Sequence, residues 1–406
     1  MNKLKQLVIL GGGHAGSSAA LAAANHLAQL MKENEFVITL VDKSSNLTIR
    51  PRLYEYELEK TQVALKSFLE PIGVKVLTSE VRDIDIQKQE ILLNDQKISY
   101  DALIVALGSQ LIQTSVPGLE HSYNIDTFAA ASQFRKALVH NLLTNNKPCR
   151  IAILGAGITG LELATELPLT VRKIAQEYKR DVPNPTIYLL DRHVATRNAG
   201  LSIEEVVKKA LEMAQVECIN QASINKIEDQ RIIYNGTEFL EVDLIVSTLG
   251  LKANNITNHF PFSKDQQGRV NVNQYLQVQE QKNCFFAGDI AHAYPAPEHA
   301  SIMSCQQGRP QGRYAGYNAV SFLLNEPLVI YSQPNYVTCI DLGEFGAVYT
   351  EGWERSLAKS GLDAKKIKQH INQDRIYPPN STDKRVLLNA GYLEFISPTS
   401  SIKKEN

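Results

Sequence analysis

The chain has 406 residues, of which 44% are hydrophobic and 21% are charged, and its formal net charge is −1. These values are ordinary for a soluble globular protein of two or three domains. The near-zero charge argues against nucleic acid as a partner, and no stretch approaches the ~18–20 apolar residues of a membrane-spanning helix.

The first predicted element is a buried parallel strand at 7–10, and a glycine-rich turn follows it directly. The turn carries Gly11, Gly13 and Gly16 in the spacing G-x-G-x-x-G. In dinucleotide-binding units the first glycine permits a tight turn, the second lets the backbone approach a diphosphate, and the third lets helix and strand pack closely. We expect the helix at 15–31 to present its N-terminus to the phosphates of a dinucleotide.

An acidic residue ends the next predicted strand, at 36–41. Asp42 stands there, where its carboxylate can accept hydrogen bonds from the ribose hydroxyls. It follows Gly16 by 42 − 16 = 26 residues, more than the usual ~20, and the long helix and the polar turn at 32–35 account for the difference.

The rest of the first unit combines basic, antiparallel and buried segments. Arg50 and Arg52 flank Pro51 and could neutralise a cofactor phosphate or face a cofactor ring, with solvated surface arginines as the alternative. Residues 74–86 and 90–93 are predicted to be antiparallel strands of a small meander. A buried strand at 102–107 then ends at Gly108.

A second unit repeats the glycine pattern. A strand at 151–154 leads into Gly155, Gly157 and Gly160, and a helix at 159–179 and a strand at 186–190 follow. Two such turns, each followed by an acidic residue at a strand end, predict two bound dinucleotides. A chain that holds two dinucleotides is expected to pass electrons between them, which favours FAD on the first unit and a nicotinamide dinucleotide on the second.

Asp191 ends the second strand of this unit and bears on the choice of nicotinamide cofactor. Its carboxylate can pair with the 2′-hydroxyl of NADH and repel the 2′-phosphate of NADPH. Arg192 and His193 follow at once and could rescue the binding of NADPH. NADH is the expected cofactor, with NADPH as the alternative.

Two glutamates lie one turn apart on the helix that follows the second glycine turn. Glu162 could contact the nicotinamide ribose or amide, and Glu166 lies four residues later on the same face. Two carboxylates on one face are unfavourable unless they are solvated or paired, which indicates a surface that handles protons or a ligand. A partly buried carboxylate at a domain interface is the alternative for Glu162.

The later elements complete a three-part organisation. Asp289 ends an apolar strand within 283–290, which suggests a return to the first unit and a contact of this carboxylate with FAD. We predict an α/β fold with two Rossmann-like dinucleotide-binding domains and a small α+β C-terminal cap or interface domain. The predicted bounds are 1–112 with 280–325 for the FAD domain, 113–279 for the NAD(P)H domain and 326–406 for the cap. The other predicted elements of the second domain are a helix at 203–214 and strands at 223–228, 231–234 and 244–249. In the cap we predict strands at 336–342 and 347–349, a helix at 363–371 and a polar tail at 397–406.

The cysteines form no C-x-x-C pair and no metal-ligand spacing, which predicts reduced thiols and no bound metal. Because no two cysteines are close in sequence, disulfide-reductase chemistry is not expected. His292 and His299 follow the Gly-Asp turn, and either could protonate a reduced acceptor, with satisfied loop histidines as the commoner alternative. The five cysteines are Cys149, Cys218, Cys284, Cys305 and Cys339.

The ordered motifs GGGHAG, ALIVALGS, GAGITGLELATEL, STLGLKAN and FFAGDIA resemble the flavoprotein reductases with two dinucleotide domains. Within that group LTIRPRLYE, TGLELATEL and SCQQGRPQG resemble the type II NADH dehydrogenases, which are NADH:quinone oxidoreductases. The resemblance implies hydride transfer from NADH to FAD and then delivery of two electrons to a quinone near Gln306 and Gln311. Cys305 and Pro310 depart from the family pattern, in which an alanine and a glutamine stand, and this concerns the acceptor more than the fold.

The motifs and the resemblance together give a set of candidate site residues. The resemblance implies that Val81 binds the adenine through its backbone, and His14 could touch the diphosphate through its own, although a histidine merely packed at the helix start is the simpler interpretation. The catalytic candidates are Glu162, Glu166, Gln306 and Gln311. The cofactor-binding candidates are Gly11, Gly13, His14, Ala15, Gly16, Asp42, Lys43, Arg50, Pro51, Val81, Ala106, Gly108 and Asp289 for FAD, and Gly155, Gly157, Ile158, Thr159, Gly160, Asp191 and Gly250 for NADH.

The electron acceptor and the location stay open at this point. Alternatives to a quinone reductase are a soluble reductase of a small electron-carrier protein, a sulfide:quinone reductase-like enzyme that would use Cys149, Cys305 or Cys339, and an NADH-binding flavoprotein that signals through a partner. We expect a cytoplasmic protein, with peripheral contact at the inner face of the cell membrane and a homodimer as further hypotheses. The apolar N-terminal run resembles a signal peptide only superficially, because it contains the first glycine turn.

Overall fold

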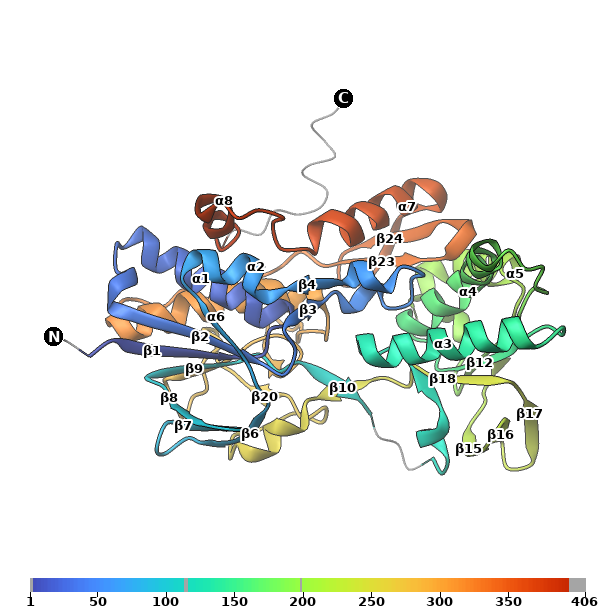
Figure 1. Cartoon of the computed structure of the whole chain (residues 1–406), viewed down its shortest axis with the longest axis horizontal. Coiled ribbons are helices and arrows are strands. Elements are labelled where there is room, and N and C mark those ends of the chain that lie inside the picture. Colours follow the sequence, from blue (N-terminus) through green and yellow to red (C-terminus); the bar gives the residue numbers. More distant parts are fainter. Residues whose placement is uncertain (1–2, 113–115, 198, 394–406) are drawn as a thin grey trace.

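Two parallel sheets lie side by side, and the C-terminal part of the chain lies over the helices of both units (Figure 1). The computed structural model describes residues 3–112, 116–197 and 199–393. The predicted tail at 397–406 lies outside the described residues. This architecture confirms the α/β fold with two Rossmann-like units.

The first sheet has the strand order β21-β9-β1-β2-β5, and all its pairs are parallel. Its central strands are apolar and buried because both faces are covered: helices pack on one face, and Ile84, Ile91 and Phe260 of a small antiparallel sheet and a loop pack on the other. The strands are β1 (Lys5–Leu10), β2 (Phe36–Asp42), β5 (Lys75–Thr78), β9 (Ala102–Val105) and β21 (Cys284–Phe286).

The second sheet repeats this arrangement with the order β11-β18-β12-β13-β14, again all parallel. In both sheets the strand before the glycine turn lies in the middle and the strand that ends in aspartate lies next to it. The strands are β11 (Tyr123–Asn124), β12 (Arg150–Leu154), β13 (Thr186–Asp191), β14 (Val216–Asn220) and β18 (Leu244–Ser247).

Two helices of the first unit, α1 (His14–Gln29) and α6 (Cys305–Leu324), pack with their backbones in close contact. A Cβ atom added at Gly312 would lie 2.0 Å from the carbonyl oxygen of Ala15, and one at Gly316 would lie 2.2 Å from that of Ala19. Only glycine fits at these two positions, so α6 is a fixed part of the first unit despite its late place in the chain.

The second unit carries three helices on one face of its sheet, namely α3 (Phe128–Thr144), α4 (Ile158–Tyr178) and α5 (Glu204–Met213). Each unit also has a small antiparallel sheet, which packs on the face of the parallel sheet opposite the helices. These are β6 (Val81–Asp85), β7 (Glu90–Leu93) and β8 (Lys97–Ser99) in the first unit, and β15 (Ile224–Glu228), β16 (Arg231–Tyr234) and β17 (Glu238–Glu241) in the second.

The single strand predicted at 74–86 is two strands in different sheets, so that prediction was wrong in its first half. Lys75–Thr78 pairs in parallel with β2, and only Val81–Asp85 joins the antiparallel meander. A polar turn separates them, and the backbone N–H of Ser79 in that turn donates to the carbonyl of Asp42 (2.9 Å). The turn therefore breaks the strand at the sheet edge where Asp42 ends β2.

Two antiparallel strands join the units where the chain crosses between them, β10 (Ser109–Leu111) and β19 (Leu251–Ala253). The domain bounds stay a prediction. Phe260 and Phe262 already pack on Phe286 of the first sheet, with ring centroids 5.1 and 6.1 Å from that of Phe286. β20 (Val270–Asn271) also pairs with β22 (Ala291–His292), beside the first unit.

The C-terminal part is a three-stranded antiparallel sheet with two helices (Figure 1). It comprises β23 (Val337–Asp341), β24 (Ala347–Glu351), β25 (Ser356–Ser360), α7 (Gly361–His370) and α8 (Lys384–Asn389), and a single π-helical turn at Ile371–Arg375 follows α7. The remaining elements of the first unit are β3 (Asn46–Thr48), β4 (Gln62–Ala64) and α2 (Leu65–Leu69). Among the described helices, none has both the length and the apolar character needed to cross a bilayer.

Candidate active site

A cavity of about 480 Å³ lies between the two dinucleotide units and the C-terminal unit. That volume is within the usual range of a small-molecule site. The predicted site residues that line it are Gly13, His14, Ala15, Arg50, Pro51, Ala106, Gly108, Ile158, Thr159, Glu162, Gly250, Asp289 and Gln306. Those that do not line it are Gly11, Gly16, Asp42, Lys43, Val81, Gly155, Gly157, Gly160, Glu166, Asp191 and Gln311.

Both glycine turns have the geometry that a bound diphosphate requires. Gly11 and Gly155 adopt left-handed conformations with φ of 102° and 101°, and a Cβ atom at Gly16 or Gly160 would lie within 2.0 Å of backbone oxygen. At Gly13 nothing stands within 4 Å of an added Cβ atom, so this side of the backbone is open. Gly157 has the same open surroundings.

The helices that follow these turns begin without a side-chain cap. Gly13 is the N-cap of α1 and Gly157 is the N-cap of α4, and neither can offer a side-chain acceptor to the first N–H groups. Free N–H groups at an uncapped helix N-terminus form an anion site. The two turns therefore fit the diphosphates of FAD and of a nicotinamide dinucleotide.

The two aspartates at the strand ends brace the glycine turns, a role that motif reasoning missed. Asp42 accepts from the backbone N–H of Gly12 (2.6 Å) and of Ser44 (2.7 Å). Asp191 accepts from Ala156 and His193 in the same way, both at 2.8 Å. Each carboxylate oxygen keeps a further lone pair, so contact with a ribose and the selection of NADH by Asp191 stay predictions.

Arg50 lies in the cavity and binds residues from both units. It donates to Ser109 Oγ (2.7 Å), which in turn donates to Asp289 Oδ2 (2.7 Å), and it lies 3.7 Å from that carboxylate. Its other nitrogen pairs with Asp126 of the second unit. Burial raises the pKa of Asp289, while Ser109 and Arg50 oppose that rise.

The solvated-arginine alternative is therefore wrong for Arg50, and it is also wrong for Arg52. Arg52 is 5% exposed and binds Glu55 at 2.6 Å. Its guanidinium also donates to the hydroxyl of Tyr377 (2.6 Å). These contacts fix the loop after β3 against the C-terminal unit.

Glu162 forms a buried ion pair with Lys368 at the cavity wall. Lys368 Nζ lies 2.7 Å from Glu162 Oε1, and both side chains are 7% exposed. The ammonium also donates to the carbonyl of Cys339 (3.1 Å), and the carboxylate accepts from the backbone N–H of Asp341 (3.1 Å). Burial raises the pKa of Glu162, and the charge of Lys368 opposes that rise.

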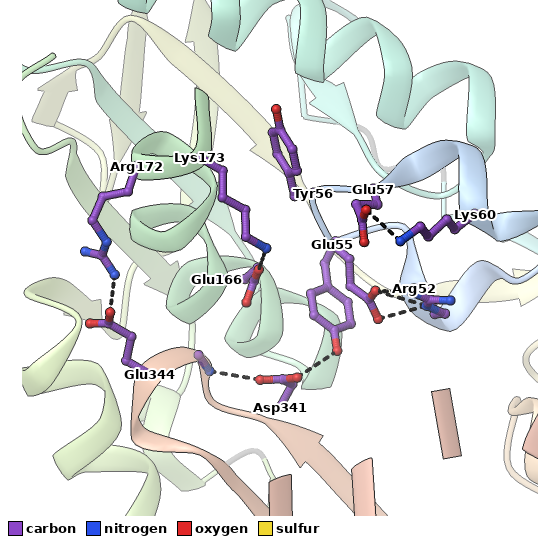
Figure 2. Close-up of polar contacts among 12 residues, drawn as sticks. Arg52, Glu55, Tyr56, Glu57, Lys60, Glu166, Arg172, Lys173, Asp341 and Glu344 are labelled. Atoms are coloured by element: carbon purple, nitrogen blue, oxygen red, sulfur yellow. Dashed lines mark hydrogen bonds and ion pairs between the residues drawn. The ribbon is translucent and has the colours of Figure 1, made fainter. Parts of the chain in front are cut away.

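Glu166 does not line the cavity and belongs to a second polar cluster (Figure 2). Lys173 Nζ is 3.9 Å from its carboxylate, and burial, with the charge of Asp341 second, raises the pKa of Glu166 to about 7. Asp341 accepts from the hydroxyl of Tyr54 (3.3 Å) and pairs with Lys365. The cluster thus holds a carboxyl group that titrates near neutrality, 6% exposed and one turn from Glu162.

The start of α6 brings Gln306 to the cavity but leaves Gln311 outside it. The amide of Gln306 lies against the backbone of Val337, donating to its oxygen (2.7 Å) and accepting from its nitrogen (3.1 Å). Gln311 is 1% exposed and accepts from the backbone N–H of Gly288 (2.7 Å). It therefore braces the turn before Asp289.

Pro310 is accommodated inside α6 because another residue replaces its missing donor. In a regular helix the N–H of residue 310 would donate to the carbonyl of Gln306. Here the side-chain amide of Gln333 donates to that carbonyl (3.1 Å). This departure from the family pattern leaves the helix intact from Cys305 to Leu324.

The thiols at the cavity are held in the neutral form. Cys305 and Cys339 line the cavity, and Cys149 does not. Burial raises the pKa of Cys339 to about 12 and also raises that of Cys305. Since the thiolate is the reactive form, these environments do not favour thiol chemistry.

Of the three candidate histidines, one lines the cavity and two lie outside its lining. His14 lines the cavity, and burial, with the charge of Arg309 second, lowers its pKa to about 3, so the ring is neutral. Within the described residues its Nε2 is buried without a hydrogen-bond partner, which fits a ligand atom there. His292 binds Asn271 (2.7 Å), and His299 stacks on Trp353 with centroids 4.4 Å apart; neither lines the cavity.

Comparisons with known proteins agree with this geometry. The sequence profile of the pyridine nucleotide-disulphide oxidoreductases matches residues 5–312. An NADH dehydrogenase-like protein of Mycobacterium tuberculosis is 36% identical over 95% of this chain and 98% of its own, and a demethylphylloquinone reductase of Synechocystis is 26% identical over 84% and 86%. The solved structure of NDH2 from Plasmodium falciparum with NADH has the same fold, with a TM-score of 0.76 and 14% identity over 96% of this chain and 98% of that one.

Proposed function

Since the chain belongs to the pyridine nucleotide-disulphide oxidoreductase family and is a flavin-dependent NADH oxidoreductase, we propose that its electron acceptor is a quinone. The observation that carries the proposal is the shared cavity. Its walls include the uncapped start of α1 and, at the C-terminal unit, the apolar side chains of Ile371 and Ile376. One space can therefore hold a flavin ring and an apolar acceptor ring. A quinone is also the acceptor named for the Synechocystis relative.

The residues that would hold the cofactors follow from the cavity walls. The N–H groups at the start of α1, with Asp289 and Arg50, would hold FAD, and those at the start of α4 would hold NADH. When bound, the two cofactors supply the hydride transfer and the two-electron reduction. The chain supplies anchoring, orientation and a cavity that excludes water.

The reduction of a quinone also consumes protons, and polar residues in and next to the cavity wall can store them. Lys368 holds a proton at Nζ on the cavity wall, and Glu162 Oε1 lies 2.7 Å away. Glu166 can bind and release a proton near neutral pH because its pKa is about 7. We propose that this pair and Glu166 carry protons toward the acceptor.

Peripheral contact with the inner face of the cell membrane and a homodimer belong to the same hypothesis. A quinone dissolved in a membrane would require such contact, and neither feature is needed for a small water-soluble acceptor. Two hypotheses compete with a quinone as the acceptor. In one the reduced flavin passes its electrons to a small soluble carrier protein, and in the other the protein binds NADH, turns over slowly and signals through a partner.

The test is an anaerobic titration of the purified, FAD-loaded protein with NADH, followed by addition of a short-chain quinone. Bleaching of the flavin absorbance by NADH and its rapid recovery with quinone would support the proposal. Bleaching without recovery would contradict it and would favour a protein acceptor or a signalling role.

A matched pair of variants locates the acceptor. Ile371→Trp fills the apolar end of the cavity and is expected to slow recovery without affecting bleaching. Ile330→Trp alters an isoleucine that is 53% exposed and outside the cavity lining, and both steps should stay as in the wild type. Equal recovery in the two variants would place the acceptor elsewhere.

A further inference from the structure

An ion pair between Arg50 and Asp126 joins the two dinucleotide units inside the cavity. Arg50 follows β3 in the first unit, and Asp126 lies between β11 and α3 in the second. Both residues line the cavity, and their side chains are 29% and 14% exposed. A guanidinium of the first unit therefore faces a carboxylate of the second within the site.

Further hydrogen bonds fix each partner of this pair. Arg50 donates to Ser109 Oγ (2.7 Å) and lies 3.7 Å from the carboxylate of Asp289. The backbone N–H of Asp126 donates to the side chain of Asn124 (3.1 Å), at the end of β11. Because both charges are held in place before any ligand binds, they can act on a developing charge without rearrangement.

The negative charge of Asp126 is felt in the first unit. Burial is the main cause that raises the pKa of Asp289, and the charge of Asp126 adds to that rise. Asp126 therefore acts electrostatically on a wall to which we assign FAD, although it belongs to the unit that binds NADH.

The two cofactor rings have to meet where both units supply the walls. The starts of α1 and α4, whose N–H groups fit the two diphosphates, line the same cavity. Hydride transfer requires the reacting rings to be in contact. Since the pair takes one residue from each unit and lines this cavity, it lies beside the place where the rings react.

Hydride transfer separates charge between the two units. It takes two electrons and one proton from the nicotinamide ring, which changes from neutral to positive, and gives them to the flavin, which changes from neutral to negative. The carboxylate of Asp126 in the NADH unit and the guanidinium of Arg50 in the FAD unit have the signs that oppose these new charges. Interactions that strengthen as charge develops accelerate the chemical step.

We propose that Asp126 favours the positive, oxidised nicotinamide ring and that Arg50, held by Asp126, favours the reduced flavin. The pair then stabilises the charge separation of hydride transfer. This role belongs to the NADH half of the reaction and does not depend on which acceptor follows. A merely structural clamp between the units is the alternative, and it would hold neutral and charged nicotinamide rings equally well.

The test of the Asp126 half compares two dinucleotides that do not react with the oxidised, FAD-loaded protein. NAD⁺ has a positive ring, whereas 1,4,5,6-tetrahydro-NAD has a neutral ring that donates no hydride. Asp126→Asn keeps an acceptor for Arg50 and removes only the charge. In titration calorimetry we expect this variant to bind NAD⁺ about fivefold more weakly and the tetrahydro analogue as tightly as the wild type. An equal loss for both ligands, or no loss for NAD⁺, would overturn the proposal.

Three further variants separate the charge from the fold. Asp243→Asn is the matched control, because Asp243 pairs with Arg150 in the second unit (2.9 Å) and neither residue lines the cavity. It should change neither affinity. Asp126→Glu keeps the charge and should bind NAD⁺ more tightly than Asp126→Asn does. If Asp126→Asn does not fold, Asp126→Ser removes the same charge and gives the same readout.

The midpoint potential of the flavin, measured without nicotinamide, tests the Arg50 half. Once the carboxylate is neutral, the charge of Arg50 is no longer offset, and the reduced flavin should be favoured. The potential of Asp126→Asn should therefore lie above that of the wild type. A potential equal to that of the wild type or below it would contradict this half of the proposal.

Discussion

Replacement of Lys368 by methionine would leave the carboxylate of Glu162 buried without its cation. Methionine fills a similar volume, so the main change is loss of charge. Removal of one partner of a buried ion pair costs about 3–5 kcal/mol, and the 7% exposure of both side chains places this pair in that class. The backbone N–H of Asp341 would be the remaining donor to Glu162 among the contacts described above.

The cost should depend on pH in a defined direction. In the variant the pKa of Glu162 in the folded protein lies above its unfolded value near 4.5, because burial is no longer opposed by Lys368. A raised folded pKa favours the folded state below the unfolded pKa, and this contribution is lost as the pH rises through the folded pKa. The variant should therefore be close to the wild type near pH 4.5 and fall furthest behind it in alkaline buffer.

Urea unfolding followed by tryptophan fluorescence measures this loss of stability in the C-terminal unit, which contains Lys368. Trp353 is the single tryptophan and lies in the C-terminal unit, stacked on Tyr336 with centroids 4.8 Å apart. Lys366→Met is the control, since Lys366 is on the same helix and its side chain is 78% exposed. If the two variants unfold at the same urea concentration in alkaline buffer, the ion pair does not stabilise the fold and the reasoning is refuted.

Four further predictions concern the cofactors and proton binding. Asp191→Ala should lower the ratio of kcat/KM for NADH over NADPH roughly tenfold, or about 1.4 kcal/mol; an unchanged ratio removes Asp191 from the selection of the cofactor. Asp289→Ala should purify with little flavin, measured by absorbance, and full FAD occupancy would disprove its role. Because burial raises the pKa of Glu166 to about 7, the free energy of unfolding of the wild type should fall as the pH rises from about 4.5 through 7. In urea unfolding, Glu166→Gln should be more stable than the wild type only at the higher pH. Replacement of all five cysteines by serine should leave reduction of the flavin by NADH intact, and a folded but inactive protein would revive thiol chemistry.

The fold could be predicted because its signals are local. Each glycine turn lies within six residues, and the strand before it and the aspartate after it recur in the same order in both units. Those patterns gave two parallel sheets, and the strand pairings confirm them. The break between β5 and β6 was missed because apolar residues recur in both halves. Pairing with β2 decides where the first half goes.

The site was harder to predict because its contacts span long separations in sequence. Lys368 lies 206 residues from Glu162, and no spacing rule connects them. Gln333 covers the carbonyl that Pro310 leaves unpaired, which only the folded chain reveals.

The contact between α1 and α6 sets an order of events during synthesis. The two helices touch at Ala15 and Gly312, which are 312 − 15 = 297 residues apart. At ~5–20 residues per second, a ribosome needs roughly 15–60 s to deliver α6 after α1 has emerged. The second unit is continuous in sequence and can fold in that interval. The first unit cannot complete its fold until α6 is made, so the Ala-rich face of α1 stays exposed. A chaperone that shields apolar helices would therefore meet this chain at its N-terminus first.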